Sequence, residues 1–127
     1  MEIVVDALQN STGNGIGAIA SPSNLKPGDT ITITCDPSDT WNLLYDRNEF
    51  QVNANGLDLF TSIGSQLFKA GAMVGSFNDG TTFFPVGTSC SIKVLEGGEM
   101  PALKLYCADN TFTNNVGAII AIVEKSS

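Results

Sequence analysis

The chain has 127 residues, which suits one domain over residues 1–127 with a single hydrophobic core. Its composition, 43% hydrophobic and 15% charged, is typical of a folded globular protein rather than a disordered one. Thirteen acidic residues against six basic ones give a formal net charge of -7, which argues against nucleic acid or an anionic membrane as the main partner.

The N-terminal segment lacks the basic region and the long apolar stretch of a secretory signal. We therefore expect cytoplasmic synthesis, with any export to the cell surface or medium by a route that needs no cleaved signal. The longest uninterrupted apolar stretch, residues 116–123, is too short to span a bilayer, so we expect no membrane insertion.

The first half of the chain predicts short strands separated by turns. Residues 2–7 form the first strand. A loop rich in Gly, Ser, Asn and Pro follows over residues 9–28, with a short strand inside it at 16–20 and a turn at KPGD. Ile and Thr then alternate in TITITC, which predicts a strand with one solvated face over residues 30–35. Residues 36–56 are polar and irregular.

The second half of the chain continues this pattern. Residues 65–77 fit either a helix or a strand, and their small central residues and flanking glycines favour a strand. The sequence NDG at 78–80 indicates a hairpin. The remaining predicted strands cover residues 82–87, 89–95, 102–107 and 116–124.

Several short strands with regular turns predict an all-β fold, an antiparallel β-sandwich of the jelly-roll-like, galactose-binding-domain-like kind. The final strand is apolar on both faces, whereas a lone antiparallel sheet has one solvated face. Burial against a second subunit explains this excess, and so does a central strand that is covered within its own chain. We predict a homo-oligomer.

The three cysteines, Cys35, Cys90 and Cys107, form no CxxC pair, and the chain has no His. A thiolate zinc site or a disulfide framework is therefore not expected. Each cysteine falls in phase with the apolar positions of a predicted strand, so we interpret all three as small buried hydrophobic residues.

The sequence CADNTFTNNVG at 107–117 carries Asp109, three Asn and two Thr, and no Lys, Arg or His. Calcium prefers oxygen ligands of these kinds, and the absence of basic side chains leaves no competing cation. Asp and Asn also form Asx-turns in ordinary loops. On residue types alone, the ordinary loop is the simpler interpretation.

Several short sequences occur along the chain in a fixed order: PGDTITI at 27–33, TWN at 40–42, ANGL at 54–57, GAMVGSFNDGTTFFPVG at 71–87 and LYCADNTFTNNVG at 105–117, with VVDA near the start. In these sequences and their order, the chain resembles the calcium-dependent, galactose-binding bacterial lectins of the PA-I type (the LecA-like family).

The resemblance implies that the closing loop binds one calcium ion and that sugar hydroxyls complete the coordination. By position, Asp109 corresponds to the carboxylate ligand and Thr111 to a backbone carbonyl ligand. Asn114 and Asn115 correspond to the paired amide ligands, and a further backbone carbonyl after the early Trp is assigned to Tyr45. Asp109 and the two Asn side chains would also hydrogen-bond to the sugar.

The chain departs from the family pattern at some positions. Ala108 stands where an Asn is usual, the closing loop is shorter, and the His that helps a Gln hold the sugar's exocyclic hydroxyl in the best-known member is absent. Asp46, Asn48 and Glu49 are candidates for a sugar-binding rim, or they are ordinary solvated loop residues. Trp41 either stacks on a sugar or anchors the core, and a core role is the more usual.

We predict that the chain is not an enzyme, because it has no His for a catalytic triad and no nucleophile or phosphate-loop motif. Two pairs of carboxylates, Asp46 with Glu49 and Glu96 with Glu99, are candidates for an acid/base pair, but nothing in the sequence distinguishes them from ordinary charged surface residues. The leading hypothesis is a calcium-dependent lectin that binds galactose or a related sugar on glycans. The alternatives are a calcium-stabilised structural or adhesion module without free-sugar binding, and a weak glycosidase or its accessory domain.

Overall fold

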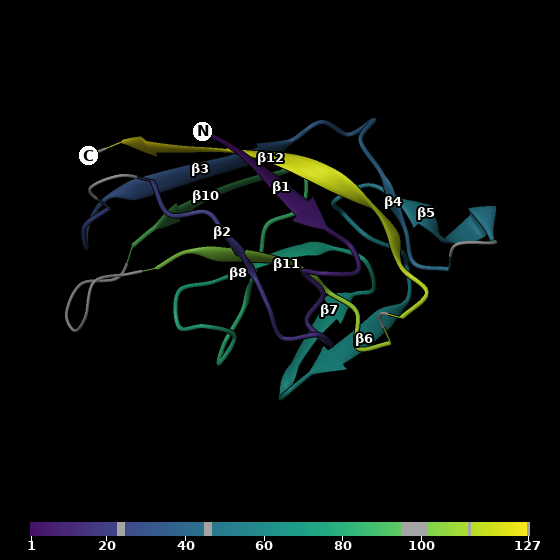
Figure 1. The fold of residues 1–127 in the computed structure, drawn as a ribbon. Helices are drawn as coiled ribbons and strands as arrows, with labels where there is room; N and C mark the ends of the chain where they lie inside the picture. The colour runs from purple at the N-terminus through teal and green to yellow at the C-terminus, as the bar shows by residue number, and fades with distance from the viewer. Residues whose placement is uncertain (23–24, 45–46, 95–101, 112, 127) are drawn as a thin grey trace.

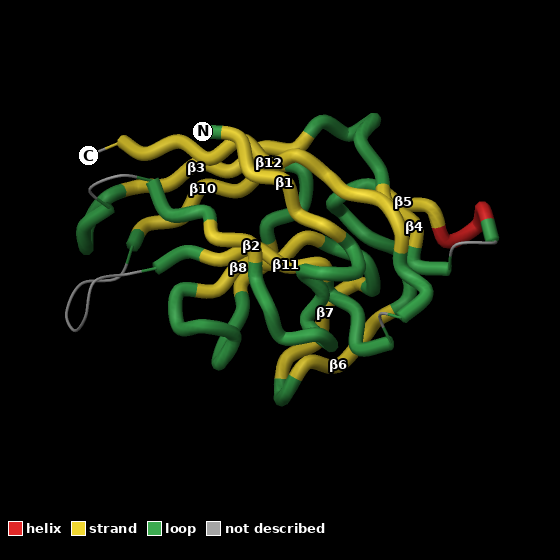
Figure 2. The backbone as a smooth tube through the Cα atoms, in the orientation of Figure 1, coloured by secondary structure: helices red, strands yellow, loops and turns green. Residues whose placement is uncertain are grey.

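Strands make up nearly all the regular structure of the molecule (Figure 2). A computed structural model describes residues 1–22, 25–44, 47–94, 102–111 and 113–126. One short 3-10 helix, η1, covers Asn48–Phe50. The strands are β1 (Glu2–Asp6), β2 (Ala18–Ile19), β3 (Thr30–Cys35), β4 (Trp41–Asn42), β5 (Gln51–Val52), β6 (Phe60–Ile63), β7 (Gln66–Lys69), β8 (Met73–Ser76), β9 (Phe84–Pro85), β10 (Ser89–Lys93), β11 (Lys104–Cys107) and β12 (Val116–Ser126).

The strands form two facing sheets and a separate hairpin (Figure 1). The larger sheet has the order β10-β3-β12-β4-β5, with β1 also paired to β12. The smaller sheet has the order β2-β11-β8-β9, and β6 and β7 form a two-stranded sheet. All of these strand pairs are antiparallel, which confirms the predicted all-β sandwich.

The core lies between the two sheets and follows the period-two pattern of the sequence. In β3 the side chains of Ile31, Ile33 and Cys35 are buried, while the alternating Thr side chains face outward. The inward side chains of β12 and the apolar side chains of β11 complete this core from the two opposing sheets, and they are Ile119, Ala121, Val123, Leu105 and Cys107.

The outer face of β12 is apolar and exposed. Ile120 and Ile122 are 45% and 41% exposed, and Val4 of β1, the register partner of Ile120, is 61% exposed. Within the described residues this face is uncovered, so the second apolar face of the final strand is not explained by burial inside the chain. The homo-oligomer stays a prediction.

The chain between residues 65 and 77 is two strands, β7 and β8, and not a helix. Gly71, with φ +80°, lies in the turn between them, and the two strands belong to different sheets. The sequence did not predict β6, and it did not resolve β4 and β5 within residues 36–56.

Trp41 is a core residue, which confirms the expectation from its type. It is 1% exposed, and its Nε1–H donates to the carbonyl oxygen of Gly71 at 2.8 Å. The cysteines are free thiols; Cys35 and Cys107 are buried, whereas Cys90 is half-buried against the core. Burial raises the pKa of the Cys35 thiol to about 11, as expected for an inert core position.

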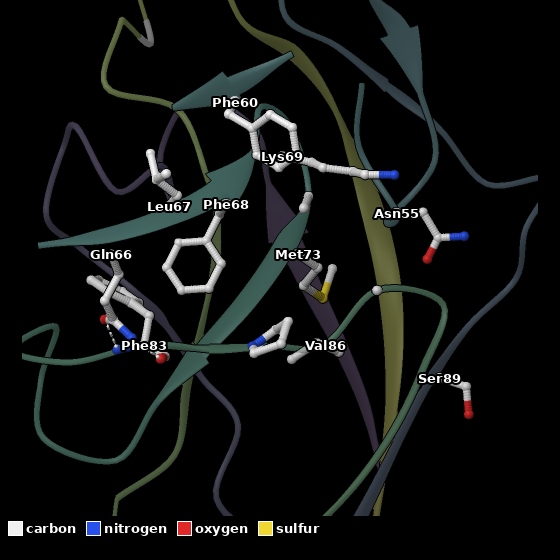
Figure 3. A pocket seen from close by; sticks show the side chains of 13 residues that line it. Asn55, Phe60, Gln66, Leu67, Phe68, Lys69, Met73, Phe83, Val86 and Ser89 are labelled. Carbon is white, nitrogen blue, oxygen red and sulfur yellow. Dashed lines mark hydrogen bonds between the residues drawn. The ribbon is translucent and has the colours of Figure 1, made fainter. Parts of the chain in front are cut away.

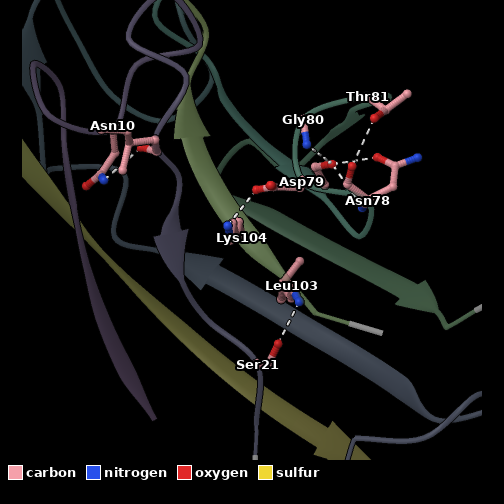
Figure 4. A network of polar contacts seen from close by, with 10 residues as sticks. Asn10, Ser21, Asn78, Asp79, Gly80, Thr81, Leu103 and Lys104 are labelled. Atoms are coloured by element: carbon pink, nitrogen blue, oxygen red, sulfur yellow. Dashed lines mark hydrogen bonds and ion pairs between the residues drawn. The ribbon is translucent and has the colours of Figure 1, made fainter. Parts of the chain in front are cut away.

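The predicted NDG turn is present and is held by a polar network (Figure 4). Asp79 and Gly80 have φ values of 57° and 85°, and the Asp79 Oδ1 lies 2.5 Å from the Nζ of Lys104. Lys104 begins β11, so this ion pair lies at the opposite end of that strand from the 107–117 loop. No helix among the described residues has the length and apolar character needed to cross a membrane.

Candidate functional site

The loop after β11 connects the smaller sheet to the larger one, and hydrogen bonds join it to the N-terminal loop. The backbone N–H of Asp109 donates to Thr12 Oγ1 at 3.0 Å, and the N–H of Gly13 donates to the carbonyl oxygen of Asp109 at 2.9 Å. A Cβ at Gly13 would lie 2.5 Å from the carbonyl oxygen of Asn110, so the close approach of the two loops requires glycine there.

Asn115 is buried and only half satisfied. It is 1% exposed, and its Nδ2 donates to the carbonyl oxygen of Ala7 at 2.8 Å. Its Oδ1 is also buried but accepts no hydrogen bond from the described residues. A buried acceptor without a partner costs about 1–3 kcal/mol, so this oxygen is the kind of feature that indicates a missing ligand.

Asp109 is a half-buried carboxylate that interacts with the side chain of Asn115. Burial raises the pKa of its carboxyl above the ordinary value, while the backbone N–H of Thr111 and the side chain of Asn115 act in the opposite direction. The Thr111 N–H donates to Asp109 Oδ1 at 3.0 Å. The ordinary Asx-turn is therefore present, but it leaves the Asn115 oxygen unpaired and the charge of Asp109 partly desolvated.

Negatively charged side chains make the electrostatic potential around the loop negative. The pKa of the Cys107 thiol is raised first by burial and then by the charges of Asp109 and Asp6. In the described part of the chain, Asp109 forms no ion pair. A cation at this position would therefore be attracted by uncompensated negative charge.

Strand pairing brings the loop after Trp41 next to the 107–117 loop. Trp41 pairs with Gly117, and Asn42 pairs with Val116, at the start of β12. The chain that continues from Asn42 must therefore pass beside residues 109–115.

A cavity of about 230 Å³ lies where the two loops meet. Asp109, Thr111 and Asn114 line it on one side, and Leu43 and Leu44 line it from the loop after Trp41. The structure thus brings together three of the predicted ligand residues with Leu43 and Leu44, which precede the predicted carbonyl ligand Tyr45 in the sequence. Asn115 is buried and does not line the cavity.

Some predicted residues are elsewhere or lie outside the described residues. Asn48 and Glu49 are exposed on η1 and do not line this cavity, and Glu49 pairs with Arg47. Tyr45 and Asp46, as well as Glu96 and Glu99, lie outside the described residues.

Sequence reasoning missed two groups of residues. The first group supports the loop, and it consists of Ala7, Thr12 and Gly13. The VVDA sequence was the one signal for it, because it ends at Ala7. The second group is apolar and lines the cavity opposite Asp109, and no sequence signal separated these side chains from ordinary core residues: Phe50, Leu57, Leu59 and Ala70.

The donor set fits calcium better than a softer metal. No cluster of three or more His, Cys, Asp or Glu side chains in the described ranges is placed to hold a metal ion. A metal in this loop would therefore depend on one carboxylate together with amide and carbonyl oxygens. Calcium accepts such oxygens in a flexible shell, whereas zinc favours the sulfur and nitrogen ligands that this loop does not offer.

Comparisons with known proteins find a similar fold in a lectin. No protein-family model and no curated protein matches the sequence. A solved structure described as "EclA N-terminal domain; PllA-like lectin" matches with a TM-score of 0.63, and the match covers 98% of this chain and 95% of that chain. The sequence identity is 21%, so the similarity establishes the fold: this chain has the fold of a lectin domain. The match to a lectin agrees with the expectation that the chain is not an enzyme.

Proposed function

We propose that this protein is a calcium-dependent lectin whose 109–115 loop binds one calcium ion and, through it, galactose or a related sugar. The observation that carries this proposal is the buried, unpartnered Oδ1 of Asn115, an amide whose side chain also interacts with the partly desolvated carboxylate of Asp109. A cation between such oxygens would satisfy both groups at once. The resemblance of the loop to the PA-I type lectins, and the lectin fold, support the same function.

Four residues would hold the ion. Asp109 would supply the charged carboxylate, Asn114 and Asn115 their amide oxygens, and Thr111 its backbone carbonyl. Bound calcium would supply a hard cation with exchangeable water, which vicinal sugar hydroxyls can replace. The chain's own part is to hold these oxygens in place, through the bonds from Asn115 to Ala7 and from Asp109 to Thr12.

The exposed outer face of β12 supports an oligomeric lectin. A site of about 230 Å³ is smaller than the roughly 300–1,000 Å³ of most small-molecule pockets, so a single site should bind a sugar weakly. Several sites on one homo-oligomer would raise the apparent affinity for a multivalent glycan surface by about 10²–10⁴-fold.

A second candidate is a structural module in which calcium only stabilises the closing loop. The observation that favours it is the position of this loop, which joins the two sheets and is bonded to the N-terminal segment at Ala7 and Thr12. Calcium at such a joint would stiffen the sandwich whether or not a sugar binds.

A glycan array with and without a chelator, run beside thermal melts, separates these functions. The lectin predicts binding to galactosides or related sugars that is lost when the chelator is added. A rise of the melting temperature with calcium and a blank array would instead identify the structural module. A protein that neither binds glycans nor responds to calcium would refute both candidates.

A further inference from the structure

The cavity beside the 109–115 loop is lined by two chemically different sets of described residues. Three of them, Asp109, Thr111 and Asn114, carry polar side chains. The others, which we term the apolar wall, are Leu43, Leu44, Phe50, Leu57, Leu59 and Ala70. Leu59 is 59% exposed, so its side chain is available to a ligand rather than committed to the core.

The backbone of the apolar wall is largely paired within itself. The N–H of Leu57 donates to the carbonyl oxygen of Ala70 at 2.8 Å, and the N–H of Ala70 donates to that of Leu59 at 2.7 Å. The N–H of Leu43 donates to the carbonyl oxygen of Phe50 at 3.1 Å. These groups are therefore not free for a ligand, and the wall offers mainly carbon surface.

Polar side chains that neighbour the wall in sequence are engaged elsewhere. Gln51 follows Phe50, but its Nε2 donates to Thr40 Oγ1 at 2.9 Å, and it lines a different hollow beside Trp41. Lys69 precedes Ala70 and lies 3.3 Å from the carboxylate of Asp58. Neither residue lines the cavity at Asp109.

We propose that the site prefers sugars that present a methyl group where galactose has its hydroxymethyl group. A 6-deoxy sugar has the methyl group itself at that position, and an O-methylated sugar carries it on the oxygen. This inference rests on the proposed calcium-dependent site. A hydroxyl placed against the apolar wall would lose its hydration without gaining a hydrogen bond from the described wall residues. A methyl group placed there would instead be removed from water by contact with carbon.

A larger cavity, of about 820 Å³, is lined in part by the β6–β7 hairpin and provides a control (Figure 3). Leu67 and Phe60 line it and are 69% and 66% exposed. The side chain of Gln66 is satisfied there by the backbone of Phe83, with both hydrogen bonds at 2.9 Å. Leu67 thus resembles Leu59 in type and exposure but lies outside the cavity at Asp109.

Isothermal titration calorimetry in saturating calcium tests the selection with matched methyl glycosides. Galactose and mannose are each compared with their 6-deoxy and 6-O-methyl counterparts, so that the two sources of a methyl group are separated. We expect at least one methyl-bearing sugar to bind about tenfold more tightly than its hydroxymethyl parent. Leu59→Gln should remove most of this preference because it places an amide in the wall, whereas Leu67→Gln should leave the preference unchanged.

The outcomes distinguish this inference from the proposed function. Calcium-dependent binding in which the hydroxymethyl sugars bind as tightly as the methyl-bearing ones overturns the inference and leaves the lectin standing. A preference that survives Leu59→Gln, or that Leu67→Gln removes equally, also overturns the assignment to the apolar wall. The absence of chelator-sensitive binding to any sugar overturns the lectin and the inference together.

Discussion

Replacing Asp109 with Asn removes the charge proposed to hold calcium while preserving the shape of the side chain. The amide oxygen of Asp109→Asn can still accept the hydrogen bond from the N–H of Thr111, so the Asx-turn should survive. In the native protein burial disfavours the charged form of Asp109, as the raised pKa of its carboxyl indicates. The variant should therefore be no less stable than the native protein when calcium is absent.

The response to calcium should differ sharply between the two proteins. Calcium at about 100 times its Kd should stabilise the native protein by about 2.7 kcal/mol. With an unfolding entropy of about 2.1 cal/mol/K per residue, a domain of 127 residues converts this free energy into a rise of about 10 °C in Tm. Asp109→Asn should show a rise of less than about 1 °C under the same conditions, because the site has lost its charged ligand.

Thermal melts followed by circular dichroism, in calcium and in chelator, measure both quantities. Asp58→Asn is a matched control, since the Asp58 side chain is 99% exposed and makes only a surface pair with Lys69. That control should keep the full response to calcium. An Asp109→Asn variant that still gains about 10 °C, or that unfolds in the absence of calcium, would refute this reasoning.

Three further predictions follow from individual side chains. Calcium affinity should fall as the pH drops through the raised pKa of Asp109. This fall should occur at a higher pH than for a carboxyl with the ordinary pKa of 3.8, and calorimetry across that pH range measures the affinity. Without calcium, the native protein should gain stability relative to Asp109→Asn over the same window, because its folded form binds the proton of Asp109 more tightly than the unfolded chain; denaturant melts that show a relative loss instead would contradict this sign. Asn115→Leu should abolish the calcium response in melts but change the stability without calcium little, because the carbonyl of Ala7 loses its donor while the unpartnered Oδ1 is removed as well. Trp41→Phe should cost roughly 1–3 kcal/mol in denaturant titrations, since the buried carbonyl of Gly71 loses its partner, and a neutral result would contradict the core assignment.

Local patterns in the sequence predict those strands that have one buried and one solvated face. The alternation in TITITC matches the alternating burial of β3, and the alternating burial in β12 gives its inward face. Residue type also predicted the core position of Trp41. These features depend on each strand's own residues, which is why a single sequence reveals them.

Features that depend on distant contacts were not predictable. Among the described strands the β6–β7 hairpin forms its own sheet, and the burial pattern of β6 is weak, so its sequence carries little strand signal. Strands β7 and β8 follow each other closely in the sequence, and the turn at Gly71 separates them. Strands β4 and β5 have two residues each, too few for a pattern.

The candidate site also combines features that local sequence patterns reveal with features that depend on distant contacts. The loop residues Asp109, Thr111 and Asn114 are close in sequence and line one cavity, while their role as ligands stays a prediction from the loop pattern and the family resemblance. The bond from Asn115 to Ala7 joins residues that are 108 positions apart, and no local pattern encodes it. The apolar wall is likewise built from four separate places in the sequence, which meet only in the folded molecule.

The linkage between calcium and sugar tests the central claim most directly. Calorimetry should determine the calcium affinity of the native protein with and without a saturating sugar chosen from the glycan array, and the sugar affinity with and without calcium. A shared site at Asp109 predicts that sugar raises calcium affinity by the same factor by which calcium raises sugar affinity. Sugar binding that is unchanged by a chelator, or calcium binding that is unchanged by the sugar, would contradict the account.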